Sequence, residues 1–268
     1  CSAERRNWRL ANEILRIEGV RKVFGGLKAV NNCSLSVTEG TIVGLIGPNG
    51  AGKSTLFDLI SGFARPDAGS IVFSGKEIVG LPAYRIARLG LIRTFQIPRA
   101  LMRMTVLENM MLGSQNQLGE MIYAPIVRRS KVLADERAIE KKAEDFLKFF
   151  DLLRMKDEYA GSMSGGQKKM LEMARALMAD PRLLLLDEPF AGVNPALSER
   201  LIEKIKLLRK NGLTIMIIEH AIPYVLALSD ELYVLNKGAI LASGQPDKVI
   251  SDSRVFEAYL GVGSDAQP

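Results

Sequence analysis

A phosphate-binding motif, with a strand before it and a helix after it, limits the fold of this chain more than any other stretch. The motif is Gly47-Pro48-Asn49-Gly50-Ala51-Gly52-Lys53-Ser54-Thr55, which fits the pattern G-x-x-x-x-G-K-[ST]. An apolar run at residues 41–46 precedes it, and a helical pattern at residues 56–60 follows it. Backbone N–H groups of such a loop converge on phosphate oxygens, and the helix N-terminus adds partial positive charge. The segment therefore predicts a strand–loop–helix unit that binds a nucleoside triphosphate.

Two side chains of the motif carry chemistry of their own. Lys53 can reach the β- and γ-phosphates, and the hydroxyl of Ser54 can hold Mg²⁺. The alternative is a glycine-rich turn with a chance lysine. At average residue usage the bare pattern arises by accident in roughly one chain of this length in a hundred. Because the flanking strand and helix are also in place, we expect a site for a nucleotide with Mg²⁺.

Two further apolar runs end in polar side chains. Four leucines at residues 183–186 lead to Asp187 and Glu188, and the run 215–218 leads to Glu219 and His220. Unbroken apolar runs suit strands of a parallel sheet, which places ligands at the carboxyl ends of its strands. We expect Asp187 to serve Mg²⁺ through a water, and Glu188 to polarise the attacking water. The lone histidine could be an ordinary surface or core residue, but its position after a strand favours a γ-phosphate contact.

The remaining pattern indicates an α/β fold with a helical insert. Short strands are expected at 14–18, 30–37 and 91–95, a turn–strand–turn unit at 68–76, and a hairpin around Lys237-Gly238. Helical spacing covers 82–89, 104–112, 130–150, 195–209, 222–228 and 252–260. Residues 13–95 and 166–261 are therefore interpreted as an ATP-binding core, and 96–165 as a mainly helical subdomain. Residues 1–12 and 262–268 are expected to be a loose extension and a tail.

Composition excludes several classes of protein. The net charge is +6, and no run of five basic residues appears, so we expect no nucleic-acid partner. No stretch approaches eighteen consecutive apolar residues, as a membrane-spanning helix would require. Cys1 and Cys33 give neither a disulfide framework nor metal-ligand spacing, which is typical of a protein from a reducing compartment.

A further motif, at residues 164–167, resembles one that is typical of a known family. Ser164-Gly165-Gly166-Gln167, followed by an amphipathic helix, resembles the signature motif of the ABC-transporter ATPases, a second phosphate-binding surface at a helix start. The order of motifs is also that of the family: aromatic residue, phosphate loop, glutamine, signature, Asp-Glu and histidine. The resemblance implies a P-loop NTPase (RecA-like) core with a small antiparallel β part and an inserted helical subdomain.

The resemblance also implies roles for single residues. Phe24 matches the position that stacks on adenine, whereas its local sequence left stacking and simple packing equally open. Gln96 matches the glutamine that contacts Mg²⁺ and responds to the membrane partner, and His220 matches the switch histidine. In this family the signature serves the ATP on the phosphate loop of a partner, which implies a head-to-tail dimer closing on two ATP molecules.

Within the family, the local match is to the branched-chain amino acid importer ATPases. It rests on Val23-Phe24-Gly25-Gly26-Leu27-Lys28-Ala29-Val30-Asn31-Asn32, Arg93-Thr94-Phe95-Gln96, Met104-Thr105-Val106-Leu107-Glu108-Asn109, Ala191-Gly192-Val193-Asn194-Pro195 and the long helical insert after Gln117. Such systems pair two related ATPases with two permeases and an external solute-binding protein. The resemblance therefore implies a peripheral protein on the cytoplasmic face of the cell membrane.

Other cargoes and roles remain open at this point. Phe190-Ala191-Gly192-Val193 also resembles the ATPase of lipopolysaccharide export, and importers of urea or amides belong to the same subgroup. A soluble mechanical ATPase is less favoured, because the chain has neither a coiled-coil insert nor a second ATPase unit. Three positions depart from the usual pattern: Met163 before the signature, Asn194 where an aspartate is frequent, and Ala221 after the histidine.

Overall fold

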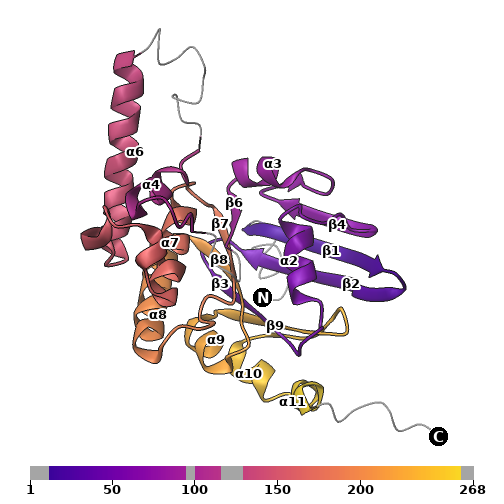
Figure 1. The fold of residues 1–268 in the computed structure, drawn as a ribbon. Helices are drawn as coiled ribbons and strands as arrows, with labels where there is room; N and C mark the ends of the chain where they lie inside the picture. Colours follow the sequence, from indigo (N-terminus) through magenta and orange to yellow (C-terminus); the bar gives the residue numbers. More distant parts are fainter. Residues whose placement is uncertain (1–11, 95–99, 116–128, 261–268) are drawn as a thin grey trace, which may run out of the picture. The chain divides into compact units, whose positions relative to one another are not determined.

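The computed structural model describes residues 12–94, 100–115 and 129–260, and the chain divides into two compact units (Figure 1). Unit 1 is built from residues 1–93, 182–189 and 205–268, and unit 2 from residues 94–181 and 190–204. The division expected from the sequence differs in two segments, because it assigned residues 166–181 and 190–204 to the ATP-binding core. Here both segments group with the helical unit, and the helix within the first contacts two other helices of that unit.

Unit 1 contains a four-stranded antiparallel sheet. Its strands lie in the order β2-β1-β4-β5. Their bounds are Glu13–Phe24 for β1, Leu27–Thr38 for β2, Ala68–Phe73 for β4 and Lys76–Glu77 for β5. Strand β1 is longer than the expected 14–18, because its pairing with β2 continues through bulges to Phe24, beyond the last buried residue Val20.

The second sheet of unit 1 has six strands in the order β10-β9-β3-β8-β7-β6. Their bounds are Ile42–Ile46 for β3, Leu91–Arg93 for β6, Leu183–Asp187 for β7, Thr214–Ile218 for β8, Glu231–Asn236 for β9 and Ala239–Gly244 for β10. All neighbours run parallel except β9 and β10, which form the expected hairpin. Every residue of β3, β7 and β8 is buried, as their unbroken apolar runs predicted.

Helices of unit 1 pack on the faces of this sheet, and strand β9 shows how. Tyr233 and Leu235 belong to the apolar cluster that includes Phe57. Leu232 and Val234, which alternate with them, belong to another cluster with Val225. The helices are α2 (Lys53–Ile60), α3 (Ala83–Arg88), α9 (Ile222–Leu228), α10 (Pro246–Ile250) and α11 (Ser253–Leu260). The sequence did not reveal α10, because one turn after a proline is too short to show a period.

Unit 2 is mainly helical. Its helices are α4 (Val106–Met111), α6 (Arg129–Phe149), α7 (Gly165–Leu177) and the first part of α8 (Pro195–Lys210), with single 3₁₀ turns at Leu153–Met155 and Ala160–Ser162. Helix α4 begins with a capping box between Thr105 and Glu108. Helix α6 buries Ala143 and Leu147 as expected, whereas Leu133, expected on the same side, is 45% exposed.

No helix among residues 12–94, 100–115 and 129–260 is both long and apolar enough to cross a lipid bilayer.

The thiol of Cys33 is expected to stay unreactive until the protein unfolds. It is fully buried in β2, and burial raises its pKa from its usual value of 9.0 to about 12, so the thiolate fraction near neutral pH falls. In a Cys1→Ser variant, a thiol reagent at pH 8 should label the protein only in denaturant. Rapid labelling of the folded variant would contradict this burial.

Candidate active site

The phosphate loop connects β3 to α2 and needs glycine at two of its positions. Gly47 has φ +152° and Gly52 has φ +102°, values that side chains rarely allow. A Cβ at Gly47 would strike the carbonyl oxygen of Leu235, and one at Gly52 would strike that of Ala29. The pattern G-x-x-x-x-G is therefore required by close backbone approach at both ends of the loop.

The turn of the β9–β10 hairpin holds the loop from outside. The backbone N–H of Gly238 donates to the carbonyl oxygen of Ala51 at 2.9 Å. The carbonyl oxygen of Gly238 in turn accepts from the N–H of Asn31 at 2.8 Å. These hydrogen bonds tie the loop to the rest of unit 1, and such preorganisation lowers the cost of ordering a loop around a ligand.

Lys53 lies at the start of α2, with only 5% of its surface exposed. Its Nζ donates to the carbonyl oxygens of Gly47 at 2.7 Å and Pro48 at 3.0 Å. Burial lowers the pKa of Lys53, and the negative charges of Glu188 and Asp187 act in the opposite direction. The ammonium of Lys53 therefore lies within the loop, at the position where it can bind phosphate oxygens.

A groove of about 800 Å³ runs beside the loop in unit 1, which is large enough for a nucleotide. Its lining joins Phe24, the loop residues 49–55, Glu188 and His220. The ring of Phe24 is 51% exposed, and Nζ of Lys22 lies 5.2 Å from its centroid. A half-exposed aromatic ring beside a phosphate loop can stack on a nucleobase at the price of little rearrangement.

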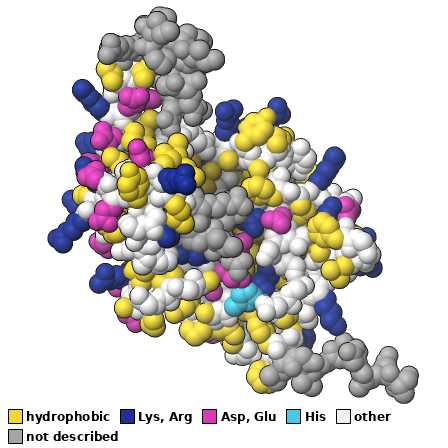
Figure 2. All heavy atoms as spheres, viewed as in Figure 1, with side chains coloured by type: hydrophobic (Ala, Val, Ile, Leu, Met, Phe, Trp, Pro, Cys, Tyr) yellow, Lys and Arg dark blue, Asp and Glu magenta, His cyan; other side chains and the backbone are white. Residues whose placement is uncertain are grey.

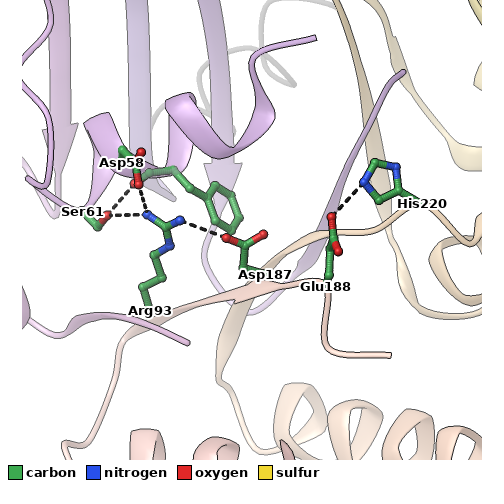
Figure 3. Close-up of polar contacts among 7 residues, drawn as sticks. Asp58, Ser61, Arg93, Asp187, Glu188 and His220 are labelled. Carbon is green, nitrogen blue, oxygen red and sulfur yellow. Dashed lines mark hydrogen bonds and ion pairs between the residues drawn. The ribbon is translucent and has the colours of Figure 1, made fainter. Parts of the chain in front are cut away.

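The two carboxylates that follow β7 point in different directions (Figure 3). Asp187 is buried, and its Oδ2 accepts from Nη2 of Arg93 at 2.9 Å. Glu188 has φ +48°, and its Oε1 lies 2.8 Å from Nε2 of His220. A left-handed backbone is uncommon for a residue other than glycine and is concentrated at functional sites. It turns Glu188 toward the groove while Asp187 stays beside α2.

His220 is oriented by the residue before it, which the sequence reading did not single out. The buried carboxylate of Glu219 accepts from the N–H of His220 at 3.0 Å and from that of Ala221 at 3.4 Å. Ala221 is the N-cap residue of α9 and offers no side-chain cap. Glu219 therefore supplies the hydrogen-bond acceptor for this turn. The sequence signal that could have indicated this role is the position of Glu219, a charged residue directly after an apolar strand.

A Glu219→Leu variant is expected to lose most ATP hydrolysis, because the turn that carries His220 loses its acceptor. Hydrogen bonds to a charged group contribute about 1.5–3 kcal/mol each, so we expect a roughly tenfold or greater fall in kcat. Glu219→Gln keeps an acceptor oxygen and should retain far more activity. Steady-state ATPase assays on both variants check this, and equal losses would contradict the role of the acceptor.

Oxygen donors fit a small divalent cation at the end of the loop. Ser54, in the first turn of α2, is exposed, and the carboxylate of Asp187 lies at the end of β7 in the same sheet as β3. Mg²⁺ is usually held by one or two such groups together with substrate phosphates. The described residues contain no cluster of three or more His, Cys, Asp or Glu side chains suited to a metal.

The signature residues lie in unit 2, at the N-terminus of the 13-residue helix α7. Ser164 is the N-cap, and its Oγ accepts from the N–H of Gln167 at 3.3 Å while Oε1 of Gln167 accepts from the N–H of Ser164 at 2.8 Å. A Cβ at Gly165 would meet open space, whereas one at Gly166 would strike Leu197. Gly165 therefore leaves the start of the helix accessible.

Two further expectations have different outcomes. Asn194 caps α8 through a hydrogen bond from the N–H of Leu197 to its Oδ1 at 2.9 Å, so it supplies the capping oxygen that an aspartate would. Gln96 lies outside the described residues, and its expected roles stay a prediction.

Figure 2 shows the histidine side chain, in cyan, exposed on the surface. The phosphate loop, the carboxylates of Asp187 and Glu188, and the capping motif at Ser164 are the parts that a nucleotide-hydrolysing domain requires. The family described as "ABC transporter" matches residues 30–191. The chain belongs to the ABC transporter family. As an ABC ATPase it binds ATP and couples its hydrolysis to transport, as the signature motif implied, and the P-loop α/β fold expected from the sequence is confirmed.

Curated relatives of this ABC ATPase span nearly its whole length. A probable branched-chain amino acid transport ATP-binding protein of Archaeoglobus fulgidus is 43% identical over 249 residues, which cover 93% of this chain and 96% of the relative. A protein of the same description from Methanocaldococcus jannaschii is 40% identical, with 93% and 98% covered. A high-affinity branched-chain amino acid transport ATP-binding protein of Pseudomonas aeruginosa is 39% identical, with 94% and 99% covered.

Solved structures of the ABC family agree with the fold. A nucleotide-free ATP-binding cassette from an ABC transporter superposes with a TM-score of 0.81 at 39% identity, covering 94% of this chain and all of the other. An ATP-binding cassette in its ADP conformation gives a TM-score of 0.78 at 39% identity, covering 93% and 99%.

Proposed function

We propose that this ABC ATPase powers an importer of branched-chain amino acids. The observation that carries the ATPase chemistry is the groove of unit 1, in which Lys53, Glu188 and His220 face the space beside the phosphate loop. The cargo is supported by the relatives, since those from an archaeon and from Pseudomonas aeruginosa both have names that state branched-chain amino acid transport.

Each residue of the groove has a role in hydrolysis under this proposal. The backbone of residues 47–55 and the ammonium of Lys53 bind the β- and γ-phosphates, and Phe24 stacks on adenine. The carboxylate of Glu188 accepts a hydrogen bond from the attacking water and aligns it with the γ-phosphorus. His220 orients Glu188 and contacts the γ-phosphate.

Mg²⁺ completes the site under the same proposal. The hydroxyl of Ser54 would hold it directly, Asp187 through a water, and Gln96 is predicted to contribute from outside the described residues. When bound, the ion compensates charge on the phosphate oxygens. Asp187 keeps the second oxygen of its carboxylate paired to Arg93 meanwhile, so its orientation does not depend on the ligand.

The assembly is proposed to be a head-to-tail pair of ABC ATPases, identical or related. In it, Ser164 and the open backbone at Gly165 would bind the γ-phosphate on the partner's phosphate loop. Two permease subunits and an external solute-binding protein would complete the importer. The ATPase would then sit as a peripheral protein on the cytoplasmic face of the membrane.

The decisive experiment for the cargo is reconstitution. The ATPase, co-purified with its permeases, is placed in vesicles with ATP inside the compartment that the ATPase faces. Uptake of labelled leucine, isoleucine or valine, dependent on ATP and on the binding protein, is expected. Uptake of urea or amides alone, or movement of lipopolysaccharide, would replace the cargo and keep the ATPase. Salt-sensitive DNA binding without any permease partner would overturn the transport proposal.

The permease contact can be mapped by crosslinking. Leu101 and Leu112 of unit 2 are 47% and 54% exposed, which is unusual for leucine, and they lie in the region after Gln96. Single cysteines at these two positions should crosslink to a permease. A cysteine at the exposed Ser243, in the β9–β10 hairpin, is the matched control, and crosslinks found only there would count against this placement.

A further inference from the structure

Arg93 is a buried charge that the hydrolysis mechanism above does not use. It ends strand β6, which pairs with β7 so that Arg93 lies opposite Leu185, two residues before Asp187. Only 7% of its side chain is exposed. A buried guanidinium is costly unless its donors are paired, so its contacts reveal what it stabilises.

The guanidinium joins two carboxylates that belong to different elements (Figure 3). Nη2 donates to Oδ2 of Asp187 at 2.9 Å, and Nη1 donates to Oδ1 of Asp58 at 2.6 Å. Nη1 also lies 3.3 Å from Oγ of Ser61, and the guanidinium carbon is 5.6 Å from the ring centroid of Phe57. Asp58, Ser61 and Phe57 all come from α2 or its C-terminal cap, so Arg93 ties the end of β7 to this helix.

The bridge reaches the face of α2 that carries Ser54. Ser54 and Asp58 are four residues apart, one helical turn, and therefore share a face of α2. Fixing Asp58 to Asp187 thus fixes the spacing between Ser54 and Asp187, the two proposed oxygen donors for Mg²⁺. One guanidinium between two carboxylates also leaves this trio with a net charge of one negative, so a cation is still attracted.

We infer that Arg93 is a positioning residue that sets the geometry of the Mg²⁺ site by clamping Asp187 to the face of α2 that carries Ser54. The inference rests on the proposed ATPase site and adds to it a residue that touches neither nucleotide nor water. Lysine cannot replace it fully, because a single ammonium lacks the planar fork that binds both carboxylates at once.

The test measures how nucleotide binding depends on Mg²⁺ in the full-length protein. Affinity for a fluorescent ATP analogue is recorded in EDTA and across a Mg²⁺ titration, for wild type, Arg93→Lys, Arg93→Gln and Asp58→Asn. We expect affinity in EDTA to change little in the Arg93 variants, while the Mg²⁺ concentration for half-maximal effect rises about 10- to 100-fold, as when other groups behind a metal ligand are lost. Arg93→Lys should keep part of the wild-type response, and kcat should fall more than KM rises.

Three comparisons separate positioning from a general loss of structure. Asp58 is 44% exposed, so Asp58→Asn should fold normally and shift the Mg²⁺ requirement in the same direction by a smaller factor. In the Arg93→Gln background the same change should add less than about twofold, because the bridge is already gone. Arg182→Gln, which removes the exposed Arg182–Glu39 pair, is the matched control and should match wild type.

The outcomes distinguish the inference from the function on which it rests. If wild type binds nucleotide without any effect of Mg²⁺, the proposed ATPase site fails. If wild type depends on Mg²⁺ and the Arg93→Lys, Arg93→Gln and Asp58→Asn variants keep its Mg²⁺ requirement, the function stands and the role of Arg93 is overturned.

Discussion

A Glu188→Gln variant is expected to bind ATP and to stop hydrolysing it. The substitution keeps the size of the side chain and leaves Oε1 able to accept from Nε2 of His220, a contact of 2.8 Å in the wild type. It removes the negative charge that polarises the attacking water. Loss of a general base lowers turnover by about 10²- to 10⁴-fold. Because ATP stays bound and intact, the variant should also accumulate as the ATP-closed dimer.

Steady-state phosphate release and size-exclusion chromatography with Mg-ATP measure both effects. Glu199→Gln is the matched control, since Glu199 is an exposed residue of α8 and does not line the groove. It should hydrolyse ATP at the wild-type rate. Near-normal hydrolysis by Glu188→Gln would remove Glu188 from its catalytic role, whatever the state of association.

A Lys53→Met variant should fail one step earlier, at nucleotide binding. Methionine preserves an unbranched chain that packs in the same space but cannot donate to phosphate. Hydrogen bonds to charged groups contribute about 1.5–3 kcal/mol each, so losing one corresponds to roughly a 10- to 100-fold rise in Kd for Mg-ATP. Hydrolysis falls at least as far, since the same ammonium would stabilise charge on the γ-phosphate in the transition state.

Titration calorimetry or a fluorescent ATP analogue measures this loss of affinity. Lys76→Met changes an exposed lysine of β5 and should bind as wild type does. A thermal melt without nucleotide shows whether the variant remains folded. An unaltered Kd in a folded Lys53→Met protein would mean that the phosphates lie elsewhere.

The parts of the fold that repeat a strong local pattern could be predicted from sequence. Strands β7 and β8 are unbroken apolar runs, and the structure buries every residue of both. The phosphate loop could be predicted because its glycines obey a steric requirement that no other residue meets, shown by the carbonyls that face Gly47 and Gly52. The family order of motifs then added the expected roles of Phe24 and Ser164.

Other features depend on contacts between distant residues, so the local sequence did not predict them. Arg93 is an ordinary basic residue in the sequence, and only the pairing of β6 with β7 places it between Asp58 and Asp187. In the sequence Glu219 is a polar residue after an apolar run. Only the turn before α9 brings its carboxylate to the backbone N–H of His220. The residues of β1 after Val20 are not buried, so pairing with β2, not a buried hydrophobic period, decides its length.

The hydrogen bonds of Lys53 also bear on how fast product can leave. Its ammonium donates to the carbonyl oxygens of Gly47 and Pro48. Because these acceptors belong to the loop itself, Lys53 would keep hydrogen-bond partners after ADP departs. Product release would therefore not leave a buried cation unpaired.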